Sequence, residues 1–199
     1  MHSPEQSTNQ LSPETRTLLL ELASASISHG LEHGTPASVN IEEYSEELQA
    51  HRACFVTLNR NGALRGCIGH LEAVQALVKD VSDNAFAAAF QDPRFPRLNP
   101  AELDGLEIHI SVLTPAEPLE FTTEQDLISK MRPGIDGLIL EEGMHRGTFL
   151  PSVWEQLPAP EQFLQHLKLK AGLSPNHWSD RIRIYRYETE SFPAEEINA

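Results

Sequence analysis

The segment from residue 53 to residue 69 constrains the fold more than any other part of this sequence. It holds two runs rich in apolar and β-branched residues, ACFVTL and ALRGCIG, separated by the polar run NRNG. Asn61 and Gly62 tolerate the positive φ angles of a two-residue hairpin loop, so the segment predicts two antiparallel strands joined by a tight turn. Such a hairpin favours an antiparallel sheet over a series of parallel strands with crossover helices.

The length of the loop decides the register of this hairpin. With a two-residue loop, Val56 lies opposite Cys67 and Cys54 lies opposite Gly69. The two cysteines then share a face but lie diagonally, about 7–8 Å apart, which is outside comfortable disulfide reach. A four-residue loop, 59–62, would place the two cysteines directly opposite each other. The Asn-Gly pair favours the shorter loop.

Apolar periodicity and end signals predict the helices. Ser12 is a helix cap, Pro13 suits the first helical position, and the glycines at 30 and 34 indicate where this first helix ends. An acidic segment follows, and then the longest helical pattern of the chain, with a wide apolar face. The expected helices are 13–30, 41–51, 73–90, 123–131 and 160–172.

Alternation of apolar and polar residues predicts the remaining strands. Strands are expected at 106–113 and 181–187, and the runs 137–140 and 147–150 predict a second hairpin around the turn EEGMHR. We expect the hairpins 53–69 and 137–150 and these two strands to form a largely antiparallel sheet, backed by the helices at 13–30 and 74–90.

The composition excludes several classes of protein. With 40% apolar residues, a chain of 199 residues can bury roughly 70% of the surface that its unfolded form exposes. A net charge of −14 disfavours nucleic acids and anionic membranes as partners. We find no apolar stretch of membrane-spanning length and no signal peptide in MHSPEQSTNQ, so we expect a cytoplasmic protein with reduced cysteines.

Six blocks of the sequence carry a family resemblance. FVTL…LRGCIG (55–69), AAAFQDPRF (87–95), ISVLTP (110–115), DGLIL (136–140), GTFLPSVW (147–154) and FLQHLKLKAG (163–172) resemble successive blocks of the AMMECR domain family, which in bacteria and archaea is protein A of the AmmeMemoRadiSam system. The resemblance implies an α+β fold, a mainly antiparallel sheet with flanking helices and a smaller appended subdomain. We place the AMMECR-like domain at 11–190, between a disordered tail at 1–10 and a polar tail at 191–199.

The LRGCIG block contains the first candidate site. Strand alternation puts Arg65 and Cys67 on one face, about 6.5 Å apart. A guanidinium at that distance favours the thiolate and raises its nucleophilicity, while Gly66 and Gly69 let a ligand or another backbone approach closely. The alternative is that Cys67 is a small buried apolar residue beside an ion pair at the sheet edge.

Other candidate residues lie on neighbouring elements. Glu107 and His109 occupy the polar face of their strand, where an imidazole can act as a base towards a thiol, or where both are simply exposed. His70 is a second candidate base. In Asp92-Pro93-Arg94 the fixed backbone aims the guanidinium, which can bind a carboxylate or phosphate, or else form an internal salt bridge.

Two classes of function follow. The first is a thiol-dependent enzyme for a small anionic substrate, with Cys67, Arg65 and His109 as catalytic residues. Its substrate-binding residues are Gly66, Gly69, Asp92, Arg94, Glu107 and, on the predicted tip of the second hairpin, Arg146. The second, implied by the family name, is a non-catalytic partner of a Memo-type protein and a radical-SAM enzyme. We expect no cofactor and no metal site, since the histidines and the glycine-containing loops lack the required spacing.

Overall fold

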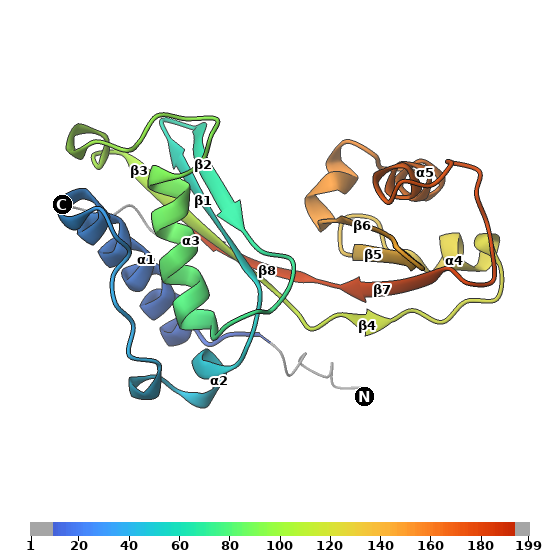
Figure 1. Ribbon diagram of the computed structural model, residues 1–199, viewed down its shortest axis with the longest axis horizontal. Coiled ribbons are helices and arrows are strands. Elements are labelled where there is room, and N and C mark those ends of the chain that lie inside the picture. Colours follow the sequence, from blue (N-terminus) through green and yellow to red (C-terminus); the bar gives the residue numbers. More distant parts are fainter. Residues whose placement is uncertain (1–9, 194–199) are drawn as a thin grey trace, which may run out of the picture. The chain divides into compact units, whose positions relative to one another are not determined.

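The computed structural model describes residues 10–193 and divides the chain into two compact units (Figure 1). Within the described residues, unit 1 consists of 10–113 with 190–193, and unit 2 consists of 114–189. Each unit has its own four-stranded sheet, so the strands that we expected in one sheet form two, and that prediction is wrong. The α+β class is confirmed. The predicted disordered tail lies outside the described residues, apart from residue 10.

Unit 1 has two long helices on one face of its sheet. The strands are β1 (Cys54–Arg60), β2 (Ala63–Gly69), β3 (Leu106–Leu113) and β8 (Thr189–Pro193), in the order β2-β1-β3-β8. The helices α1 (Pro13–His33) and α3 (Leu77–Phe90) pack against each other and against the sheet. Because β8 extends to Pro193, the predicted polar tail begins inside a strand.

The first helix begins where its sequence predicts and ends at Gly34, the later of the two predicted glycines, so it is three residues longer than the expected 13–30. Thr15 N donates to Ser12 Oγ at 3.1 Å, and Gly34 closes the helix in the left-handed conformation with φ 74°. The helix predicted at 41–51 is wrong in part, since it is divided into a 3₁₀ turn, η1 (Ile41–Glu43), and one turn of helix, α2 (Glu46–Gln49). The extended backbone between these turns breaks the helical hydrogen bonding.

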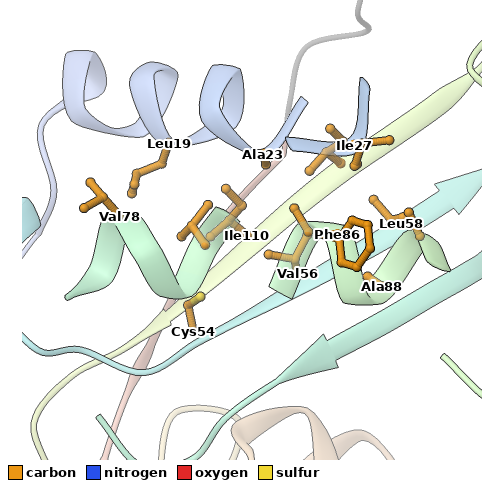
Figure 2. Close-up of a cluster of buried hydrophobic side chains, with 14 of the residues drawn as sticks. Leu19, Ala23, Ile27, Cys54, Val56, Leu58, Val78, Phe86, Ala88 and Ile110 are labelled. Atoms are coloured by element: carbon orange, nitrogen blue, oxygen red, sulfur yellow. The ribbon is translucent and has the colours of Figure 1, made fainter. Parts of the chain in front are cut away.

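The core of unit 1 lies between the two helices and the sheet. Alternate side chains of a strand point to the same face, so one face of β1 and β3 is buried while the other stays partly exposed. Figure 2 shows the buried side chains of α1, α3, β1 and β3 meeting in this layer. The labelled members are Leu19, Ala23, Ile27, Cys54, Val56, Leu58, Val78, Phe86, Ala88 and Ile110.

Unit 2 is smaller and has a separate core. Its strands are β4 (Glu117–Pro118), β5 (Gly137–Glu142), β6 (His145–Phe149) and β7 (Arg183–Tyr187), in the order β4-β7-β5-β6. Its helices are α4 (Glu124–Lys130) and α5 (Pro160–Lys170), and it also contains the 3₁₀ turn η3 (Pro151–Glu155). The 3₁₀ turn η2 (Pro100–Glu102) belongs to unit 1. The Trp154 indole stacks on the Phe163 ring in the centre of this core, with ring centroids 3.8 Å apart.

Two further findings concern the second hairpin and the helices of the described chain. The strands of the second hairpin are longer than predicted, and the turn is shorter, because Gly143 adopts φ 58° and lets the chain reverse at once. Across residues 10–193, no helix combines the length and the apolar character needed to cross a membrane.

Candidate functional site

The β1–β2 hairpin positions Cys67, and a bulge decides which side it faces. The turn is the predicted two-residue loop, with Asn61 at φ 52° and Gly62 at φ 74°. Beyond it, a register shift between Leu58 and Asn59 pairs Thr57 with Cys67. The predicted pairing of Val56 with Cys67 is therefore wrong, because the bulge adds one residue to β2.

The shift also separates the two cysteines. Cys54 belongs to the buried face of β1, whereas Cys67 lies half-buried on the opposite face of the sheet, so the prediction of a shared face is wrong. Burial raises the pKa of the Cys54 thiol, and the neighbouring Asp80 carboxylate adds to the rise. Cys54 is therefore a buried structural thiol, and Cys67 is the one that a small molecule can reach.

The Arg65 guanidinium is bound by groups other than Cys67. Arg65 is the unpaired residue of the bulge, and its guanidinium binds Glu102 through Nε at 2.8 Å and Nη2 at 3.0 Å. Nη2 also donates to the Pro96 carbonyl at 2.9 Å. The paired guanidinium lowers the Glu102 pKa to about 2. The activation of the thiol by Arg65 therefore stays a prediction, with the guanidinium already paired with Glu102.

The two motif glycines allow close packing within unit 1. A Cβ on Gly66 would lie 2.1 Å from the Ala88 carbonyl oxygen of α3, and one on Gly69 would lie 2.4 Å from the Cys54 carbonyl oxygen. The close approach that we predicted therefore exists, but the partner at Gly66 is a helix backbone. Gly66 lets α3 lie directly against β2.

Asp92 and Arg94 hold the backbone of Cys67 from the open edge of the sheet. Asp92 Oδ2 accepts from Cys67 N at 2.9 Å, and Arg94 Nη2 donates to the Cys67 carbonyl at 3.2 Å. The two side chains also pair with each other at 2.7 Å, and these bonds hold the Asp92 pKa far below its usual range. Because β2 is an edge strand, the pair takes the place of a neighbouring strand.

His109 shares the exposed face with Cys67, two strands away. Thr57 is the register partner of both residues, so the three lie in one row across β2, β1 and β3. Thr57 Oγ1 donates to Cys67 Sγ at 3.2 Å. Two strand spacings put the outer two Cα atoms about 10 Å apart. Glu107 Oε2 lies 3.8 Å from His109 Nε2, and both side chains are partly exposed.

Thr57 was missed by the sequence analysis because its importance depends on the register. Two other candidates lie elsewhere. Arg146 lies within β6 of unit 2, where its Nε pairs with Glu141 Oε1 at 3.1 Å, so its predicted place on the hairpin tip is wrong. His70 Nδ1 lies 2.9 Å from Oδ1 of the buried Asp80 carboxylate.

Asp80 is a second residue that sequence reasoning missed. Its carboxylate is buried and accepts bonds from Cys54 N at 3.1 Å and Asn84 Nδ2 at 3.0 Å, in addition to its contact with His70. A charged residue inside the apolar stripe of the helix predicted at 73–90 was the signal that could have identified it.

Two further observations bear on ligands. Within residues 10–193, no group of three or more His, Cys, Asp or Glu side chains is arranged to hold a metal ion. Two cavities, of about 370 and 520 Å³, lie in unit 2, and none of the predicted site residues lines either of them. Cys67 instead lies half-buried beside Thr57, on the sheet face opposite α1 and α3.

Comparisons with known proteins agree with the fold. The family model described as AMMECR1 matches residues 20–192. A protein of Methanothermobacter thermautotrophicus is 41% identical over 157 residues, which cover 76% of this chain and 80% of the relative. A Thermotoga maritima protein is 42% identical over 154 residues, covering 76% and 83%. The crystal structure of an uncharacterized protein from Pyrococcus horikoshii matches with a TM-score of 0.75 and 35% identity, over 90% of this chain and 91% of that one.

Proposed function

The chain belongs to the AMMECR1 family, and we propose that it is a thiol-dependent enzyme that acts on a small anionic substrate through Cys67. One observation carries the proposal: a half-buried thiol accepts a hydrogen bond from Thr57 on the sheet face opposite α1 and α3. A hydroxyl in this position can donate to the sulfur and hold it in one orientation towards a substrate.

The chemistry that fits this row is acyl transfer. The Cys67 sulfur forms a bond to the substrate's carbonyl carbon, and its proton passes through a bridging water to the His109 imidazole, because Thr57 separates the two residues. The bond from that carbon to the leaving group then breaks, and the leaving group takes the proton from the imidazolium. Water then attacks the acyl-cysteine, the bond from carbon to sulfur breaks, and the acid product leaves as the sulfur regains a proton. A substrate that covers Thr57 would touch both the thiol and the imidazole.

Arg94 is the residue suited to an anionic group of the substrate. Its side chain is 54% exposed, while its partner Asp92 is almost fully buried. Nε and Nη2 are taken by Asp92 and the Cys67 carbonyl, and Nη1 has no partner among the described residues. A carboxylate or phosphate can therefore bind Nη1 close to the thiol.

The test uses a small thioester that carries a carboxylate, with residue-resolved mass spectrometry of acylated cysteine. We expect Cys67 to be acylated faster than the same cysteine in urea-unfolded protein, and an uncharged thioester with the same leaving group to react more slowly. Thr57→Val and His109→Asn should slow the reaction, while Ser111→Ala, on the same face of β3, should not. Equal rates in folded and unfolded protein would remove the proposal.

A second candidate is a non-catalytic partner of a Memo-type protein and a radical-SAM enzyme. The observation in its favour is that Arg65, the cation expected to activate the thiol, is bound by Glu102 instead. Cross-linking and co-purification from the same cell would recover one of these two proteins in this case. Two results together would favour the role of a non-catalytic partner over that of an enzyme. One is that the Cys67→Ser variant still binds the Memo-type protein or the radical-SAM enzyme, and the other is that Cys67 is not acylated.

A further inference from the structure

Trp178 lies at a cavity of unit 2 that the proposed function does not use. The cavity has a volume of about 520 Å³, is open to solvent, and lies between α4, α5 and the loop before β7. This volume is within the range of small-molecule sites. Its lining residues are Thr123, Glu124, Gln125, Ile128, Glu161, Gln165, Pro175, Asn176 and Trp178.

Three exposed side chains line this open cavity with carboxamide groups. Gln125, Gln165 and Asn176 come from three different elements, and their carboxamides have no hydrogen-bond partner among residues 10–193. The indole N–H of Trp178 also has none within the described chain. Each carboxamide offers both a donor and an acceptor, as hydroxyl groups require, whereas a phosphate or carboxylate only accepts.

The charge of the cavity excludes an anion as the preferred ligand. The neighbouring ammonium belongs to Lys168, whose side chain is fully buried and whose charge is paired with Glu124. Lys168 Nζ also lies 5.6 Å from the centre of the Trp178 ring. With this charge already satisfied and Glu161 at the rim, an anionic ligand would gain no cationic partner.

Hydrogen bonds to Glu142 of β5 hold the loop that carries Trp178. This buried carboxylate accepts from His177 Nε2 at 2.6 Å and from Ser179 Oγ at 2.5 Å, on either side of the tryptophan. Phe121 packs against the indole with ring centroids 5.7 Å apart. The indole is thus held in place before any ligand arrives, which lowers the entropy cost of binding.

We propose that this cavity binds a neutral polyhydroxylated ligand, of the size of a monosaccharide or disaccharide, with its hydroxyl groups on the three carboxamides and its C–H groups against Trp178. An aromatic wall beside planar amide groups matches a sugar, which has an apolar ring face and a rim of hydroxyl groups. This site is independent of Cys67.

The experiment follows the two indole N–H resonances in ¹H–¹⁵N spectra, assigned with Trp178→Phe. The probes are glucose, N-acetylglucosamine and maltose, with glucosamine as a cationic and glucose 6-phosphate as an anionic comparison. We expect a neutral sugar to shift the Trp178 resonance saturably and leave that of Trp154, which is bonded to the Asp136 carbonyl, in place.

Two matched variants locate the binding. Gln165→Ala should weaken the affinity for the sugar by about fivefold to tenfold, the loss expected for one neutral hydrogen bond. Gln162→Ala, also exposed on α5 but outside the cavity, should leave it unchanged. The proposal is overturned if no neutral sugar shifts Trp178, if glucosamine or the phosphate binds in place of the neutral sugars, or if the two variants behave alike.

Discussion

Replacing Gly66 with alanine tests the claim that this glycine serves helix packing. In the structure the added Cβ would lie 2.1 Å from the Ala88 carbonyl oxygen and 3.0 Å from its carbonyl carbon. Ordinary contact begins at 3.4 Å, so α3 and β2 would have to separate by about 1.3 Å at this point. Both opposing atoms belong to the backbone, so no side-chain rotation relieves the clash.

The magnitude follows from what the separation disturbs. The helix α3 is buried along most of its length, and its apolar side chains pack against β1 and β2. Overpacking of such a core costs about 1–3 kcal/mol, and a clash with backbone atoms should cost an amount near the upper end of this range, because the backbone cannot move aside as a side chain can. We expect Gly66→Ala to lower the free energy of unfolding by about 3 kcal/mol and the melting temperature by about 6–12 °C.

The assay is urea unfolding, followed by hydrogen exchange of the α3 amides so that unit 1 is observed separately. The control is Gly34→Ala, where a Cβ meets nothing within 4 Å but the φ of 74° is unfavourable for alanine. That variant should lose only about 1 kcal/mol. If Gly66→Ala is as stable as the Gly34 variant, with unchanged exchange in α3, the packing argument is wrong.

Three further predictions concern charge and burial. The pKa of Glu102 is lowered from 4.5 to about 2, so its pairing with Arg65 stabilises the fold above pH 4.5, and this stabilisation is lost as the pH falls towards 2. Glu102→Gln should therefore flatten the dependence of the urea midpoint on pH between 5 and 2.5. An unchanged slope would contradict this prediction. Asp92→Asn should lower the free energy of unfolding by about 2 kcal/mol in urea, because charged hydrogen bonds to Arg94 are lost, and a change below about 0.5 kcal/mol would refute it. Burial raises the pKa of Tyr187 to about 12, so absorbance at 295 nm should show this phenol ionising near that pH in the folded protein and near 10 in urea. The free energy of unfolding should fall as the pH rises above 10. Ionisation near 10 in both states would show that the phenol is exposed.

Local rules account for the features that the sequence predicted correctly. The caps at Ser12 and Gly34 and the turn at Asn61-Gly62 depend on hydrogen bonds and φ angles within a few residues. The strand at 106–113 depends on an alternation that repeats every two residues. These signals are complete within a short window, so the sequence alone determines them, and the block pattern adds the family.

Tertiary contacts decided the candidate site. The bulge at Arg65 is not specified by the alternation of the strand, yet it moves Cys67 opposite Thr57, and Arg65 pairs with Glu102. The role of Asp92 likewise depends on β2 being the edge of the sheet, which is a property of strand order. Neither could follow from periodicity, because periodicity assumes an unbroken register.

The division into two sheets has the same origin. The alternating patterns at 137–140 and 181–187 showed strands, but a pattern specifies which face of a strand is buried, not which strand lies beside it. That choice was made by long-range packing, where the Trp154 and Phe163 rings give the residues of unit 2 a core of their own. The sequence therefore determined the elements and their local ends, and the tertiary structure determined their neighbours, since pairing between distant strands is fixed by core packing and not by local conformation.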